Sequence, residues 1–355
     1  MITISLCMIV KNEENNLPCC LASVRDLTDE LIIVDTGSTD RTKEIAASFG
    51  AEIFDFEWCD DFSAARNFAF SKASMEYCMW LDADDILSDR TAFLRLKSEL
   101  SNDTDVVMMR YHTAFDNGGK PTFTYWRERL LRRAAGFAWE GAVHEAITPR
   151  GKIYYSDASV SHRKTFSSDP DRNLRIYEKL RNSKKTFSPR ERFYYARELM
   201  YHARYAEAAA EFTAFLDDGK GWIENNLEAC RNLAFCYKQL HDTRAVFFAL
   251  SRALRYGPPR AELCCDFGEF FFERAEWNSA IFWYEAALRD KTENTSGGFS
   301  LPDCRGIIPY LQLCVCFYRL GDTFRAKSCN EEVGKLDPRN AAYLYNKSFF
   351  DSLSN

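Results

Sequence analysis

Residues 77–85 read YCMWLDADD, an apolar run that ends in carboxylates. The apolar part predicts a buried strand, and Asp82 and Asp84 leave its carboxyl end one residue apart. Two carboxylates in this spacing can hold a divalent cation and ligand hydroxyl groups together, because carboxylate oxygens suit Mg²⁺ or Mn²⁺. A DxD pattern by itself often lies in a solvated turn. Its position directly after a buried strand favours the functional interpretation.

The sequence on both sides of this stretch alternates between short strands and helices of about ten residues. The predicted strands are 2–10, 31–34 and 52–54, and the predicted helices are 17–25, 39–49 and 62–73. This alternation is typical of βαβ units and a mainly parallel sheet. After Asp85 the pattern becomes mixed, with a helix over 90–99, a strand over 105–111 and β-rich segments over 122–132 and 152–162.

Polar residues follow each of the first apolar strands. The segment 11–14 reads KNEE after the first strand, and 35–40 reads DTGSTD after the second. Because ligands bind outside the carboxyl ends of parallel strands, these segments predict a ligand site at one edge of the sheet. No GxGxxG follows the first strand and no GxxxxGK[ST] occurs, which argues against a dinucleotide fingerprint and a P-loop.

The second half, from about residue 189 to 338, has helical patterns throughout. Ala234 to Gly268 and Ala253 to Ala287 are both 34 residues apart, which is the tetratricopeptide period. We therefore predict four tetratricopeptide-like repeats, the fourth after an insert around 292–303. A non-repeating helical bundle is the alternative. Short solenoids of this kind usually bind a peptide, a protein or a second copy of themselves.

Composition narrows the class of protein further. The formal net charge is −6, which provides no global attraction for nucleic acid. The 13 cysteines are odd in number and irregularly spaced, with no CxxC, so a reducing compartment is expected. The apolar segment 1–10 lacks the features of a signal peptide, and no apolar run reaches the length of a membrane span. We expect a cytoplasmic protein, at most peripheral at the inner face of the membrane.

Four segments in this order and spacing resemble the nucleotide-binding half of family 2 glycosyltransferases with the GT-A fold. They are SLCMIVKNEE (5–14), IIVDTGSTDRT (32–42), FSAARNFA (62–69) and MWLDADD (79–85). With trailing repeats, the chain is similar to a bacterial subgroup that includes peptide S-glycosyltransferases and lipopolysaccharide-core-type enzymes. The resemblance implies a Rossmann-like α/β GT-A domain with a mixed, mainly parallel sheet, followed by an all-α solenoid. The expected parts are a catalytic domain over 1–165, a helical linker over 166–188, repeats over 189–340 and a tail over 341–355 that caps the solenoid or pairs with another chain.

The resemblance also assigns nucleotide contacts. Asp35 would accept a hydrogen bond from the uracil imide, so the donor would be a UDP-sugar, unless Asp35 only caps the next helix. Arg66 would reach the base or the diphosphate, unless it is an ordinary surface arginine. Asp82 would contact the ribose and the metal. The remaining nucleotide contacts implied are Val10, Asn12, Glu14 and Ala83.

The metal and the catalytic base come from the same resemblance. Asp84, Asp82 and a late histidine, His162, would bind Mn²⁺ or Mg²⁺, and Asp85 stands in a supporting position where the family often has Glu. The segment 139–145, WEGAVHE, resembles a recurring WxGxxHE segment. An inverting transfer needs a base for the acceptor nucleophile, and Glu145 is the first candidate and Glu140 the second. Either carboxylate could instead only orient its neighbours.

Two nearby groups are open to both functional and structural interpretations. His144 would bind the diphosphate or the acceptor, or be a buried histidine satisfied by the backbone. A basic cluster, Arg163, Lys164 and Arg172, would screen the diphosphate or be a solvated charge run.

The resulting hypothesis is a metal-dependent inverting hexosyltransferase that uses a UDP-sugar. The acceptor would be a peptide, a protein, a glycan or a lipid-linked glycan, and the repeats would bind a protein partner or mediate self-association. The main alternative is a catalytically inactive adaptor built on the repeats. A sugar nucleotidyltransferase is disfavoured because KNEENN (11–16) is a poor glycine-rich phosphate loop.

Overall fold

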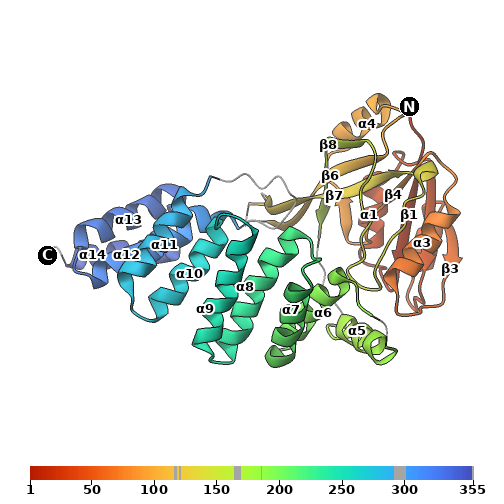
Figure 1. Ribbon diagram of the computed structural model, residues 1–355. Helices are drawn as coiled ribbons and strands as arrows, with labels where there is room; N and C mark the ends of the chain where they lie inside the picture. Colours follow the sequence, from red (N-terminus) through yellow and green to blue (C-terminus); the bar gives the residue numbers. More distant parts are fainter. Residues whose placement is uncertain (116–117, 120, 164–168, 185, 292–300, 354–355) are drawn as a thin grey trace. The chain divides into compact units, whose positions relative to one another are not determined.

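The computed structural model describes residues 1–115, 118–119, 121–163, 169–184, 186–291 and 301–353. They form two compact units, Met1–Thr186 and Phe187–Asn355. The first unit is an α/β domain, and every regular element in the described residues of the second is a helix (Figure 1).

The first unit is built on one mixed sheet with the strand order β3-β2-β1-β4-β7-β6-β8-β5. Strands β3, β2, β1 and β4 are mutually parallel, β6 is parallel to β8, and the pairs β4–β7, β6–β7 and β5–β8 are antiparallel. The strands are β1 Ile4–Val10, β2 Glu30–Asp35, β3 Glu52–Asp55, β4 Tyr77–Trp80, β5 Asp85–Leu87, β6 Val106–Phe115, β7 Pro121–Arg132 and β8 Ile153–His162. The predicted mixed sheet is confirmed. The three-residue β5 was missed, because so short a strand has no periodicity of its own.

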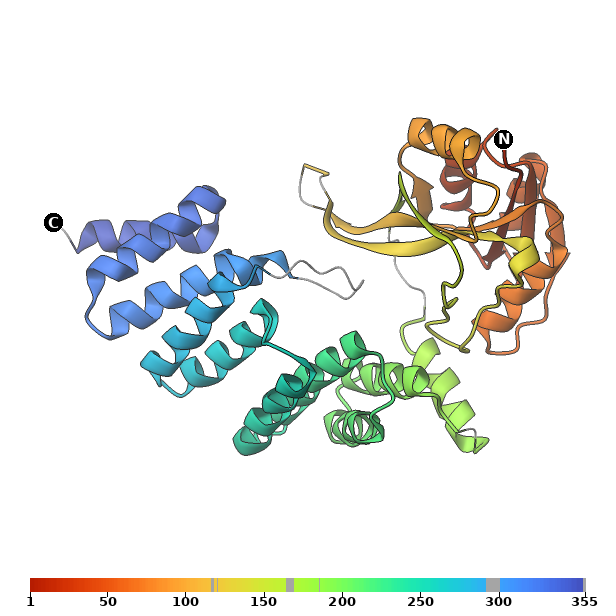
Figure 2. The ribbon, with the colours of Figure 1, turned by 45° about the horizontal axis from the view of Figure 1, so that its top comes forward.

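Helices cover both faces of the parallel part of this sheet (Figures 1 and 2). Alternate residues of β1 point to opposite faces. Leu6 and Met8 pack with helices α1 Leu17–Val24, α2 Thr42–Ser48 and α4 Arg90–Glu99. Cys7 packs on the other face with Ala69 of helix α3 Phe62–Lys72. The carboxyl ends of β1, β2 and β4 are thereby held at a common edge.

Helix α5, Arg172–Asn182, lies in the first unit. The sequence interpretation assigned this segment to a linker over 166–188. In the structure Tyr177 is fully buried, and its hydroxyl donates a hydrogen bond to the carbonyl oxygen of Val143 at 3.2 Å. Lys179 forms an ion pair with Asp60 at 2.6 Å. Through these contacts α5 packs against the α/β domain and forms part of it.

The second unit consists of helix pairs, as the 34-residue spacing predicts (Figure 1). The pairs are α6 Pro189–Tyr201 with α7 Tyr205–Asp218, α8 Ile223–Gln239 with α9 Thr243–Arg252, α10 Ala261–Glu273 with α11 Trp277–Arg289, and α12 Ile307–Arg319 with α13 Thr323–Leu336. Each three-residue turn within a pair contains one residue of positive φ, namely Ala203, His241, Ala275 and Gly321. The predicted all-helical solenoid is confirmed, and the described residues contain four such helix pairs, the number of repeats expected from the sequence.

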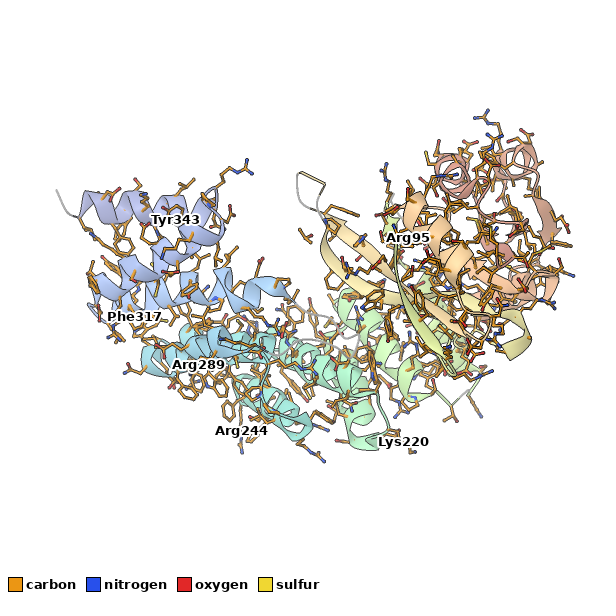
Figure 3. The ribbon with its side chains drawn as sticks, turned by 90° about the horizontal axis from the view of Figure 1, so that it is seen from above. Arg95, Lys220, Arg244, Arg289, Phe317 and Tyr343 are labelled. Atoms are coloured by element: carbon orange, nitrogen blue, oxygen red, sulfur yellow. The ribbon has the colours of Figure 1, made fainter. Side chains whose placement is uncertain are left out.

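Small residues allow the helices of a repeat to approach closely. A Cβ at Gly268 would lie 2.6 Å from the buried ring of Tyr284, so any larger residue would force this ring or the helix to shift. The last helix, α14 Ala341–Ser352, packs on α13, where Asn330 donates to the backbone oxygen of Tyr343 at 3.1 Å. Tyr343 and Phe317 are both buried in this last part of the chain (Figure 3).

Among the described residues, we find no helix that combines the length and the apolar character needed to cross a membrane.

Candidate active site

The loops after β1 and β2 are joined by hydrogen bonds. The Asn12 side chain accepts from the backbone N–H of Thr39 at 2.8 Å, and the Glu14 backbone N–H donates to Asp40 at 3.1 Å. The Val10 carbonyl oxygen accepts from the backbone N–H of residue 36 at 2.9 Å. Val10, Asn12 and Glu14 therefore shape the edge at which they were predicted to contact a nucleotide.

Asp35 has a buried carboxylate at the end of β2, only 1% exposed. Its Oδ1 accepts from the backbone N–H groups of Gly37 and Ser38, both at 2.9 Å. Its Oδ2 is also buried and has no hydrogen-bond partner within the described residues. Because a buried acceptor without a partner is costly, this oxygen is suited to a ligand N–H.

The end of β4 and the end of β8 bring three candidate metal ligands together. Ligand atoms of Asp84, Asp85 and His162 all lie within 4.8 Å of one another. His162 Nδ1 is 3.4 Å from Asp84 and 3.3 Å from Asp85, and these hydrogen bonds raise the pKa of His162 to about 10. Carboxylate oxygens with one imidazole are a donor set that fits Mn²⁺, and the carboxylates also fit Mg²⁺. The predicted ligand Asp82 is not in this group.

Asp85 is the most constrained of the three. It is fully buried and forms an ion pair at 3.0 Å with Arg129, which is also fully buried. Its carboxylate further accepts from the Tyr111 hydroxyl at 2.8 Å and from the Asp82 backbone N–H at 3.1 Å. Burial acts to raise the pKa of Asp85, but the charge of Arg129 and these hydrogen bonds outweigh it, and the pKa is lowered. Of the three candidate metal ligands, only Asp84 and His162, whose side chains are each 22% exposed, are accessible to a metal ion from solvent.

Arg129 reaches Asp85 because β7 is irregular at this point. The register between β6 and β7 shifts between Val107 and Met108, which pair with Leu130 and Glu128 and leave Arg129 outside the ladder. Such a bulge re-aims a side chain next to a functional site. The Arg129 guanidinium lies 3.8 Å from the centre of the Trp80 ring.

Arg66 of α3 bridges two carboxylates. Its Nη2 donates to Asp82 and its Nε donates to Glu145, both at 2.6 Å. Arg66 is 7% exposed, and its guanidinium lies 5.2 Å from the Trp80 ring centre and 4.8 Å from that of Trp139. Burial acts to lower the pKa of Arg66, but the two carboxylates outweigh it and raise the pKa. Asn67, the next residue of α3, forms two hydrogen bonds with the Trp139 backbone: it accepts from the N–H at 2.8 Å and donates to the carbonyl oxygen at 3.0 Å.

A cavity of about 330 Å³ opens beside these groups. Its wall includes Arg66 and Asp82, the loop residues His144 and Glu145, and Arg172 of α5. The full lining is Phe62, Arg66, Trp80, Asp82, Arg127, Val143, His144, Glu145, Arg172 and Asn173.

The two candidate bases differ in their relation to this cavity. The Glu145 side chain is 11% exposed and faces the cavity, whereas Glu140 is exposed, is absent from the cavity wall and pairs through its backbone with Ala146. Ala83 is buried between the two carboxylates of the DxD motif. Of the predicted basic cluster, Arg172 lines the cavity, the Arg163 backbone N–H donates to the Asp84 carbonyl oxygen at 2.8 Å, and Lys164 lies outside the described residues.

Sequence reasoning did not single out Arg127, Arg129 or Trp80. The signal available was the pair of arginines in an apolar β-rich segment. Both guanidinium groups lie against Trp80, at 4.8 and 3.8 Å from the ring centre, but the bulge at Arg129 interrupts the strand alternation, so alternation alone does not place them there.

Comparison with known proteins assigns the first unit to a family. Residues 5–154 match the family described as "Glycosyl transferase family 2". The N-terminal domain is therefore a family 2 glycosyltransferase domain, in agreement with the resemblance seen in the sequence.

Three relatives illustrate the range of similarity. A TPR repeat-containing protein of Synechococcus elongatus is 40% identical over 148 residues, 41% of this chain and 36% of the relative. The SPbeta prophage-derived glycosyltransferase SunS of Bacillus subtilis is 40% identical over 88 residues, 24% of this chain and 21% of the relative. The lipopolysaccharide core biosynthesis glycosyltransferase LpsC of Rhizobium meliloti is 31% identical over 161 residues, 42% of this chain and 58% of the relative. The chain thus spans less than two thirds of each of these proteins.

Proposed function

We propose that this protein is a metal-dependent, inverting glycosyltransferase that moves a hexose-type sugar from a UDP-sugar to an acceptor nucleophile. The observation that carries the proposal is the meeting of Asp84 and His162 at the edge of a family 2 domain, next to the cavity that Asp82 and Glu145 line. The catalytically inactive adaptor is less well supported, because these side chains are all present and clustered.

The donor side of the proposed site lies at β1, β2 and β4. The free Oδ2 of Asp35 would accept the imide N–H of uracil. Asp84 and His162 would hold Mn²⁺ or Mg²⁺, with Asp82 as a further ligand or a ribose contact. A bound cation supplies Lewis-acid neutralisation of the leaving diphosphate.

The acceptor side lies in the cavity. Strand β7, which contributes Arg127, is adjacent to β4 on the side away from β2, so the cavity extends from Asp82 away from Asp35. Glu145 would take the proton of the acceptor nucleophile as that atom attacks the anomeric carbon, and the bond to the UDP oxygen breaks on the opposite face. Its place on the cavity wall favours Glu145 over Glu140 for this role.

The acceptor class remains broad in this proposal. Four helix pairs provide a surface of the kind that binds peptides or proteins, so we infer that the repeats hold the acceptor or a protein partner, or mediate self-association. A peptide or protein, a glycan and a lipid-linked glycan are the acceptor classes that the proposal includes.

The test is release of UDP from a panel of UDP-sugars, with Mn²⁺ or with EDTA, comparing the wild type with Asp84→Ala. We expect metal-dependent release that prefers one sugar and is lost in the variant, because slow hydrolysis by water reveals a donor without its acceptor. Absence of release from every donor, together with no stabilisation by UDP and Mn²⁺, would favour the adaptor.

A further inference from the structure

The donor site and catalytic base proposed above do not use Arg66, for which the family resemblance implied a contact with the uracil base or the diphosphate. This arginine is a buried cation with two anionic partners that belong to different halves of the proposed site. Asp82 belongs to the DxD motif, 16 residues along the chain, and Glu145 to the acceptor side, 79 residues along the chain. Both hydrogen bonds are 2.6 Å long, so one guanidinium joins the two halves directly.

The surroundings of Arg66 keep it in this position. Trp80 and Trp139 contact its guanidinium, and Asn67, the next residue on α3, fixes the Trp139 backbone. With 7% of the residue exposed, the cation has little access to water and depends on its carboxylate partners. A planar guanidinium can serve both at once, through Nε and Nη2, and a lysine ammonium cannot reproduce that geometry.

The two partners differ in what else they can bind. The Asp82 side chain is 36% exposed and leaves β4 two residues before Asp84, whereas Glu145 is 11% exposed and lies outside the cluster of candidate metal ligands. Asp82 is not among the clustered ligand atoms but leaves the strand next to them, so a cation at the DxD motif and Arg66 would compete electrostatically for the charge of Asp82. Glu145 influences that competition, because it attracts the same guanidinium from the other side.

We infer that Arg66 is a positioning residue that couples metal loading at the DxD motif to Glu145. The inference rests on the proposed function, since it takes the metal site and the base from it. If Asp82 turned toward a bound cation, Arg66 would keep Glu145 as its only carboxylate partner. Arg66 would then hold the Glu145 carboxylate in place on the acceptor side whenever the donor side carries its metal. By reciprocity of linked equilibria, a change at Glu145 must alter metal affinity although Glu145 is not in the ligand cluster.

The experiment measures binding of Mn²⁺ alone to the full chain, from the electron paramagnetic resonance signal of the free ion. Arg66→Gln removes the competitor and is expected to tighten Mn²⁺ binding about fivefold, the lower end of typical coupling between sites. In Glu145→Gln the guanidinium of Arg66 has Asp82 as its only carboxylate partner, so we expect the affinity for Mn²⁺ to fall by a similar factor. In the double variant, the effect of Glu145→Gln should shrink to less than about twofold, because its mediator is gone.

Arg172→Gln is the matched control, since it removes an arginine from the same cavity wall without touching Asp82. Its Mn²⁺ affinity should differ clearly less from the wild type than that of Arg66→Gln. Thermal unfolding without metal checks that each variant folds; if Arg66→Gln does not, Glu145→Gln alone decides through its weakened Mn²⁺ binding.

Equal Mn²⁺ affinity in Arg66→Gln and Arg172→Gln, or an unchanged affinity in Glu145→Gln, would overturn the coupling while leaving the proposed function intact. A wild type that binds no Mn²⁺ would instead refute the metal-dependent function, and the coupling with it.

Discussion

Replacement of Arg129 by methionine should destabilise the α/β domain strongly. Arg129 and Asp85 are both 0% exposed and lie 3.0 Å apart, so the variant removes the buried counter-charge of Asp85 and leaves His162, at 3.3 Å, as its remaining cationic partner. Loss of one partner of such a pair costs about 3–5 kcal/mol. For a unit of the size of Met1–Thr186, each kcal/mol lowers the melting temperature by about 2–4 °C, so we expect a decrease of roughly 10 °C. Methionine keeps much of the volume against Trp80, which limits the contribution of a cavity.

Scanning calorimetry of the full chain measures this decrease in melting temperature. A double variant tests whether the decrease comes from the charge of Asp85 left without Arg129. In Asp85→Asn the single amide oxygen can still accept from the Asp82 backbone N–H, and the amide N–H can donate to the Tyr111 hydroxyl oxygen. Arg129→Met combined with Asp85→Asn should therefore recover at least about half of the lost stability. As a control, Lys152→Met, which removes an exposed ion pair with Asp103, should have the same melting temperature as the wild type. A loss below about 1 kcal/mol for Arg129→Met, or a double variant less stable than the single one, would refute the reasoning.

Three further predictions concern the nucleotide, the base and the repeats. Asp35→Asn should weaken UDP binding at least about tenfold in calorimetric titration, since the amide replaces either an acceptor of two backbone N–H groups or the free oxygen; unchanged affinity would remove Asp35 from the uracil site. Glu145→Gln should lower kcat for transfer by about 10²–10⁴-fold, whereas Glu140→Gln should retain most of it, and the reverse order would exchange their roles. Gly268→Ala should destabilise the helical unit by about 1–3 kcal/mol in urea unfolding, because its Cβ would meet the Tyr284 ring at 2.6 Å; a neutral result would show that the ring moves aside easily.

Much of the fold could be predicted because its signals are local. Apolar strands followed by polar loops gave the parallel half of the sheet, and the 34-residue spacing gave the helix pairs. The place of α5 could not be predicted, since it depends on contacts of Tyr177 and Lys179 with residues 34 and 119 positions away. From its sequence alone, a charged amphipathic helix between two domains is equally consistent with a linker and with a packed part of one domain.

The sequence indicated members of the candidate site one by one, but it did not indicate the network of contacts that joins them. The sequence indicated Asp84 and His162 as ligands, and the structure brings their side chains within 3.4 Å. It gave no indication that Arg66 would bridge Asp82 and Glu145, because that geometry depends on three separate chain segments. The role of Arg129 depends on a bulge in β7, which no periodicity reveals.

The most direct test of the account is a crystal structure of the full chain with UDP and Mn²⁺, with data collected at the manganese absorption edge. We predict an anomalous peak within coordination distance of Asp84 and His162, with the uracil imide hydrogen-bonded to the Oδ2 of Asp35. A manganese peak away from both ligands, or a nucleotide that leaves Asp35 unpartnered, would contradict the central claim.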